Sequence, residues 1–70
     1  MTVFYELQGE GARERLGAFA RTLEKAGIPA ELLESTAQPD LFLLLCRPDE
    51  AALPTSAPAG TKVWQFRAVR

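Results

Sequence analysis

The feature that most constrains the fold is an unbroken run of six apolar residues, Leu41 to Cys46, within a chain of 70 residues. The run is far shorter than the ~20 residues that a membrane-spanning helix needs. A short apolar run between turn residues, here Asp40 and Pro48, is typical of a buried strand. Because side chains alternate along a strand, a strand without polar positions favours cover on both of its faces.

Two elements are predicted before this run. Residues 2–8 contain β-branched and aromatic side chains, which predicts a first strand that ends at the glycines of GEG. Residues 10–26 carry apolar side chains at spacings of three and four, the period of an amphipathic helix, and Gly27 supplies the stop signal. The apolar stripe of this helix consists of Ala12, Leu16, Phe19, Ala20, Leu23 and Ala26.

The other segments complete the pattern. Residues 28–36 have good helix propensity, but their short length before the turn TAQPD favours a second strand that forms a hairpin with the third. Residues 48–61 are rich in Pro, Ala, Ser and Gly, which indicates a loop with room for one helical turn over residues 49–53. Residues 62–70 alternate and predict a fourth strand.

This order of elements is that of the split βαβ, or ferredoxin-like, fold. We therefore predict one α+β domain over residues 1–70, of order βαββ(α)β. It would have a four-stranded antiparallel sheet, one main helix, and a reduced second helix or loop. In this plan the first and third strands lie in the centre of the sheet and the second and fourth at its edges.

A single helix leaves one face of the sheet open, and the alternation of the strands predicts what that face contains. The side chains expected toward the helix are Val3, Tyr5 and Leu7 in the first strand and Trp64, Phe66 and Ala68 in the fourth. The open face is predicted to contain Phe4, Phe42, Leu44, Val63 and Val69. A monomer rarely exposes so large an apolar patch, which predicts a homodimer through this face. The alternative is that the 48–61 loop folds back over it.

Composition limits the chemistry that the chain can support. With one cysteine and no histidine, we expect no internal disulfide, no metal site and no cofactor. A net charge of −1 argues against a nucleic-acid partner, and the aromatic residues lack the flanking basic and glycine residues of an RNA-recognition module. The opening MTVFYELQG lacks the basic region of a signal peptide, which predicts a cytoplasmic protein without a membrane partner. The chain contains no asparagine, and scarce amide side chains are typical of proteins from thermophiles.

Three groups of residues are candidates for chemistry, none of them predicted to be catalytic. Cys46 has no histidine or basic cluster beside it, which predicts a buried small hydrophobe and not a nucleophile. The stretch GEGARER, residues 9–15, resembles a phosphate-binding turn but lacks the third glycine, which favours turn glycines alone. Glu6 and Arg67 form a candidate polar pair on the open face, whose alternative is an ordinary exposed cross-strand pair.

Three resemblances extend this prediction. The segment ELQGEGARERLGAFARTLEKAGIPAELLES resembles the opening of ACT-type regulatory domains, with Gly11 before the helix and EKAGI at its exit. That resemblance implies amino-acid binding at a dimer interface. In size, in composition and in PDLFLLLCRPDE and KVWQFR, the chain is similar to small α+β proteins of unknown function from the Thermus–Deinococcus group. The architecture also resembles dimeric α/β-barrel monooxygenases, which pack ferredoxin-like sheets face to face, although their catalytic histidine has no counterpart here.

The expectation that follows is a small bacterial protein that serves as a non-enzymatic homodimeric interaction module. The alternative is a regulatory domain of ACT type that binds a small-molecule ligand. A monooxygenase of the dimeric α/β-barrel type ranks third.

Overall fold

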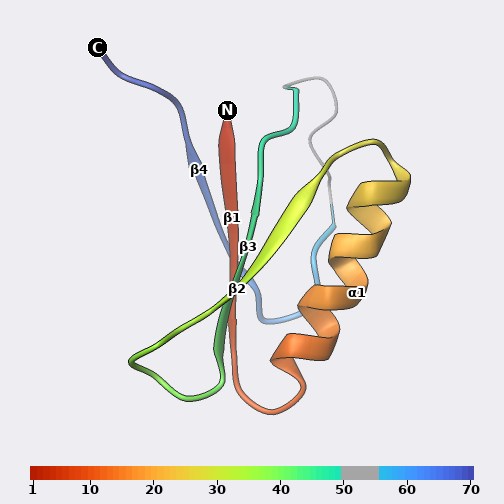
Figure 1. The fold of residues 1–70 in the computed structure, drawn as a ribbon, viewed down its shortest axis with the longest axis vertical. Helices are drawn as coiled ribbons and strands as arrows, with labels where there is room; N and C mark the ends of the chain where they lie inside the picture. The colour runs from red at the N-terminus through yellow and green to blue at the C-terminus, as the bar shows by residue number, and fades with distance from the viewer. Residues whose placement is uncertain (50–55) are drawn as a thin grey trace.

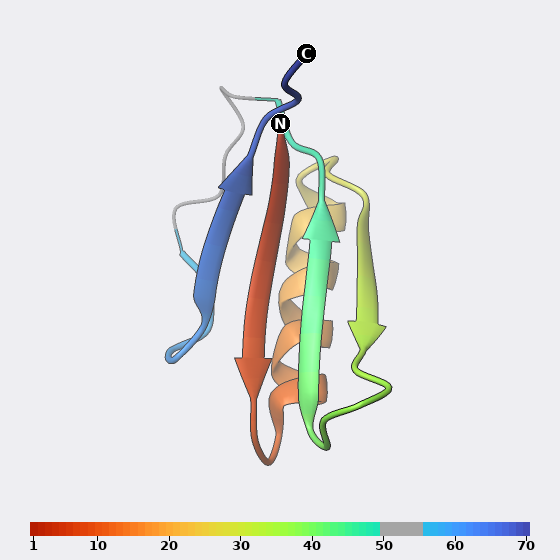
Figure 2. The ribbon, with the colours of Figure 1, turned by 90° about the vertical axis from the view of Figure 1, so that its left-hand side faces the viewer.

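The computed structural model describes residues 1–49 and 56–70. Its elements are β1 (Thr2–Gln8), α1 (Ala12–Lys25), β2 (Ala30–Glu34), β3 (Leu41–Cys46) and β4 (Lys62–Phe66). The strands form one sheet in the order β2-β3-β1-β4, and every neighbouring pair is antiparallel (Figure 2). This arrangement confirms the predicted ferredoxin-like α+β fold, with β1 and β3 in the centre. The helical turn expected over residues 49–53 lies, from residue 50 onward, outside the described residues.

Helix α1 has the amphipathic pattern and the end that the sequence predicts. Its buried side chains, at spacings of four, three and four, form the stripe that faces the sheet. At its C-terminus, Gly27 has a φ of 84°, its N–H bonds to the Glu24 carbonyl at 3.0 Å, and the Ile28 N–H bonds to the Leu23 carbonyl at 2.9 Å. This is a Schellman motif, in which a glycine adopts the left-handed conformation and the following apolar residue returns to the core. The buried residues of α1 are Ala12, Leu16, Phe19 and Leu23.

The core lies between α1 and one face of the sheet (Figure 1). Tyr5 of β1 packs edge-on against Phe19 of α1, with ring centroids 4.9 Å apart. Helix α1 contacts β1, β2 and β3 but does not reach β4. The strand residues in this core are Val3, Tyr5 and Leu7 of β1 and Phe42, Leu44 and Cys46 of β3.

The segment between β3 and β4 returns along the same side of the sheet as α1 where the structure describes it. Ala57 packs against the core, and the Arg15 guanidinium donates to the Ala59 carbonyl. Among residues 1–49 and 56–70, no helix has both the length and the apolar character to cross a bilayer. The described elements therefore all lie within the sheet or on its helix side, and the opposite face is open.

The face assignment predicted for β4 is wrong. In the observed register Trp64 pairs with Phe4 and Phe66 pairs with Thr2, which places both aromatic residues on the open face. Val63 pairs with Tyr5 and therefore lies on the helix side, where it is still 45% exposed because α1 does not extend over β4.

The face assignment predicted for β3 is also wrong for the two residues placed on the open face. Phe42 and Leu44 are buried in the core, opposite Leu7 and Tyr5 of β1. Of the five residues expected on the open face, Phe4 is there. Val69 lies beyond the end of β4 and is 92% exposed.

Because neighbouring leucines of β3 lie on opposite faces, replacing each by alanine should lower the free energy of unfolding by different amounts. Leu44 is completely buried between Tyr5 and Leu32, so Leu44→Ala leaves a cavity and should lower the free energy of unfolding by about 2–5 kcal/mol. Leu45 is half-buried on the open face, so Leu45→Ala should lower the free energy of unfolding of the monomer clearly less. Urea denaturation at low protein concentration measures both, and equal losses would contradict the observed faces.

Candidate functional site

The candidate site is the open face of the sheet, the face that α1 does not cover (Figure 2). The strand registers place every second residue of each strand on it, and most of these side chains are apolar. The three leucines of β3 on this face are only half-buried, whereas their neighbours toward α1 are buried. The open face consists of Thr2, Phe4, Glu6, Gln8, Glu31, Leu33, Leu41, Leu43, Leu45, Lys62, Trp64 and Phe66.

One corner of the open face is an aromatic ridge, formed by Trp64 and Phe66 of β4. The Trp64 indole Nε1–H donates to a carboxylate oxygen of Glu6 at 3.2 Å. Phe66 packs edge-on against Phe4, with ring centroids 5.6 Å apart. Trp64 and Phe66 nevertheless remain 48% and 53% exposed. Neighbours on β1 thus orient two large, solvent-exposed rings.

The diagonally opposite corner holds a hollow of about 480 Å³ at the turn between β2 and β3. The turn is held by Ser35, whose hydroxyl accepts from the N–H groups of Ala37 and Gln38 at 3.2 and 2.9 Å. The Ser35 N–H in turn bonds to the Leu41 carbonyl at 2.9 Å. These bonds make the hollow part of the turn's own structure. Its lining consists of Leu33, Glu34, Ser35, Thr36, Leu41 and Leu43.

The polar pair expected between Glu6 and Arg67 does not form. Glu6 is paired across the sheet with Lys62, and its carboxylate accepts from Trp64. Arg67 lies past the other end of β4, beyond the pairing of Thr2 with Phe66. The error follows from the face assignment of β4, because a shift of one residue exchanges its two sets of side chains.

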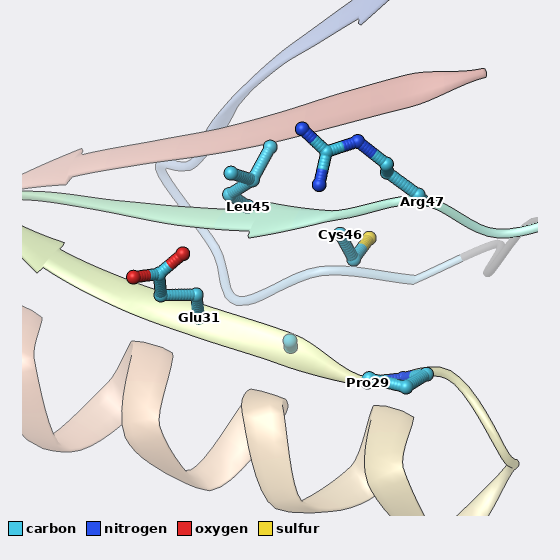
Figure 3. Close-up of a pocket in the computed structure, with 6 residues that line it drawn as sticks. Pro29, Glu31, Leu45, Cys46 and Arg47 are labelled. Atoms are coloured by element: carbon cyan, nitrogen blue, oxygen red, sulfur yellow. The ribbon is translucent and has the colours of Figure 1, made fainter.

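A second, smaller hollow of about 310 Å³ lies between β2 and β3 at the other end of this pair. Figure 3 shows Leu45 and Arg47 on one side of β3 and Cys46 on the other, with the Glu31 carboxylate facing β3 from β2. Opposite charges therefore flank an open apolar surface. Its lining consists of Pro29, Ala30, Glu31, Leu45, Cys46 and Arg47.

Cys46 is buried, as the sequence predicts, although it touches this hollow. Burial raises the pKa of its thiol, which lowers the thiolate fraction at neutral pH. The thiolate is the nucleophilic form, so the site does not activate Cys46.

Tyr5 is the other buried titratable group of the core. Burial, with a smaller contribution from Cys46, raises the pKa of Tyr5 to about 12. Its hydroxyl is completely buried and has no hydrogen-bond partner among the described residues. A buried hydroxyl of this kind costs stability, because it loses its bonds to water.

The glycine turn of residues 9–15 has a structural role. The Ala12 N–H bonds to the Gly9 carbonyl at 3.1 Å, and the Arg15 N–H bonds to the Gly11 carbonyl at 3.0 Å. The side chain of Arg15 is directed to the Ala59 carbonyl. In the part of the chain that the structure describes, no group of three or more Cys, Asp or Glu residues could hold a metal ion.

Sequence reasoning missed Trp64, Phe66 and Lys62 as open-face residues. Alternation within β4 favours burying Trp64 and Phe66, because Gln65 and Arg67 flank them. A usable signal was Phe4, since aromatic side chains often pair across neighbouring strands. Comparison of the chain with protein-family models, with curated proteins and with solved structures finds no match.

The Tyr5 hydroxyl predicts a pH-dependent effect of Tyr5→Phe. Because the folded pKa of about 12 exceeds the unfolded value of 10.0, ionisation of Tyr5 does not affect the free energy of unfolding below pH 10. From pH 10 toward 12 the unfolded chain loses its Tyr5 proton first, so the free energy of unfolding falls. The loss is about 1.4 kcal/mol per pH unit. Tyr5→Phe should keep or raise the thermal midpoint at pH 7 and reduce its decline above pH 10. A lower midpoint at pH 7 with an unchanged alkaline decline would contradict this account.

Proposed function

We propose that the protein is a non-enzymatic interaction module that forms a homodimer through its open sheet face. The single observation that carries the proposal is the apolar, uncovered surface around the half-buried leucines of β3 and the exposed rings of Trp64 and Phe66. An exposed apolar patch of this extent marks an interaction surface in most soluble proteins. We retain a cytoplasmic location as part of the proposal.

The size of the face supports a reversible dimer of moderate affinity. Strands about 4.8 Å apart, with residues that rise about 3.3 Å each, give this four-stranded face roughly 400 Å² in projection. Because side chains project from it, two copies face to face would bury on the order of 1,000 Å² of accessible surface in total, the lower range for a specific interface. Weak and transient complexes lie at this end of the size range, so we expect a dissociation constant on the order of micromolar.

The charges of the open face favour a second copy of the chain, and not a nucleic acid, as its partner. Glu6 and Lys62 are cross-strand neighbours, and Glu31 and Arg47 flank the smaller hollow. Opposite charges in equal number suit a surface that meets its own copy, since each acidic group can find a basic one. An RNA-binding sheet instead combines its aromatic platform with an excess of basic side chains.

The proposal predicts a concentration-dependent mass. Sedimentation over about 1 to 500 µM should show a shift from monomer to dimer. The fluorescence of Trp64, the only tryptophan of the chain, should move to shorter wavelength as the ring is covered. Leu43→Lys, which places a charge in the middle of the face, should keep the protein monomeric. Phe66→Lys, at the exposed ridge, should do the same with less risk to folding.

The matched control is Ala18→Lys, which adds the same charge at an exposed position of α1 and should leave the dimer intact. A wild-type protein that remains monomeric over the whole range would overturn the proposal. Quenching of Trp64 by single-stranded RNA at physiological salt, with no dimer, would instead identify the face as an RNA-binding platform.

A small-molecule ligand is a second candidate function, favoured by the smaller hollow. Arg47 and Glu31 on either side of Leu45 could bind the carboxylate and the ammonium group of an amino acid. This arrangement suits a regulatory domain of the ACT-like kind.

The second candidate predicts a thermal shift with amino acids. A zwitterionic amino acid at millimolar concentration should raise the Tm by mass action, and Arg47→Gln should abolish the rise. Arg13→Gln, an exposed arginine of α1, is the matched control. No shift with any amino acid would remove this candidate.

A further inference from the structure

We propose that the hollow at the β2–β3 turn receives Trp64, with Phe66 beside it, from a second copy of the chain, the two sheets crossing at about 90°. This inference rests on the proposed homodimer and adds which residues meet. A two-fold axis would run diagonally across the open face, so that each copy inserts its aromatic ridge and accepts the ridge of the other. The hollow is then a binding site that only the partner copy completes.

The shape of the sheet supports this pairing. In Figure 1 the C-terminal end of β4 and the turn after β2 both lean toward the open side, while the beginning of β2 leans toward α1. The open face is therefore saddle-shaped, with its two raised corners at the aromatic ridge and at the hollow. When two such sheets cross at about 90°, raised corners meet raised corners, which is the contact that seats a ridge in a hollow.

The strand registers distinguish the crossed arrangement from the aligned ones. Phe4, Trp64, Leu45 and Glu31 form one row across the sheet, and Glu6, Lys62, Leu43 and Leu33 form the next. Strands lie about 4.8 Å apart and such rows about 7 Å apart, which fixes where each side chain of a second copy would fall.

With the two-fold axis parallel to the strands, Trp64 of one copy falls on β2 of the other at the level of Glu31. With the axis across the strands, Trp64 falls on Lys62. Only a diagonal axis places Trp64 between Leu41 and Leu43, at the centre of the hollow, and Phe66 at its Leu33 side. The crossed arrangement is thus the one that buries both rings against apolar side chains.

Both surfaces are preformed, which favours their association. Trp64 is oriented by Glu6 and Phe66 by Phe4, while Ser35 holds the turn that walls the hollow. Groups already held in the bound geometry lose less freedom on binding. In the crossed dimer, Lys62 of each copy also lies beside Glu6 of the other, so the four charges near the axis alternate in sign.

The experiment tests which residues face each other. Single-cysteine variants carry Cys46→Ala together with Gln8→Cys, Glu31→Cys or Lys62→Cys, so that any link joins two chains. Mixtures are treated with a short bifunctional thiol reagent, and linked dimers are counted. The crossed arrangement predicts efficient linking of Gln8→Cys to Lys62→Cys. An axis parallel to the strands predicts linking of Lys62→Cys to Glu31→Cys, and an axis across the strands predicts linking of Lys62→Cys to itself without linking to Gln8→Cys. In the crossed arrangement Lys62→Cys also links to itself, because Lys62 lies near the two-fold axis, so the link to Gln8→Cys is the one that distinguishes this arrangement.

Two substitutions then test the role of the ridge. Trp64→Ala should raise the dimer dissociation constant at least tenfold, whereas Val63→Ala, similarly exposed on the other face of β4, should leave it unchanged. A dimer that links through Lys62 with Glu31, through Lys62 with itself but not with Gln8, or through none of these pairs overturns the crossed arrangement but keeps the homodimer. A protein that sediments as a monomer overturns the proposed function, and the inference with it.

Discussion

The structure depends on a single helix that covers one face of the sheet, although the central strand β3 is apolar on both of its faces. Helix α1 buries Phe42, Leu44 and Cys46, and the alternate leucines of β3 remain half-buried on the other side. Any arrangement in which α1 covered the other face would bury leucines equally well but would expose the apolar set of β1. The side chains of Val3, Tyr5 and Leu7 therefore decide which face the helix occupies, and β3 adapts to them.

This constraint separates the part of the molecule that provides stability from the part that we assign to recognition. The helix side contains a closed core with a Schellman motif at its edge and a buried cysteine of low reactivity. The open side contains oriented but exposed groups, among them Trp64 held by Glu6 and a hollow walled by the Ser35 turn. The open face can thus change by substitution at alternate strand positions without loss of the core, because successive strand residues point to opposite faces.

The resemblances to ACT-type domains and to dimeric α/β-barrel proteins stay expectations. They share one physical idea, which is that a ferredoxin-like sheet with an apolar open face is completed by another copy. The proposed homodimer is supported by the open face of this chain, above all by Trp64, Phe66 and the half-buried leucines of β3.

Local patterns in the sequence determined the elements and the strand order. Residues 12–25 follow the helical period, and β1, β3 and β4 lie within or at the predicted strands, because periodicity and turn residues act over short distances. The alternation of β1 correctly predicted that Val3, Tyr5 and Leu7 face the helix, but only the tertiary structure decided which faces β3 and β4 present. Trp64 and Phe66 look buried by their own alternation, yet pairing with Phe4 and Thr2 turns them outward. In β3 both faces are apolar, so only the pairing with β1 decides which of its side chains face the helix. Register depends on contacts between residues distant in the chain, and a slip of one residue exchanges core and surface.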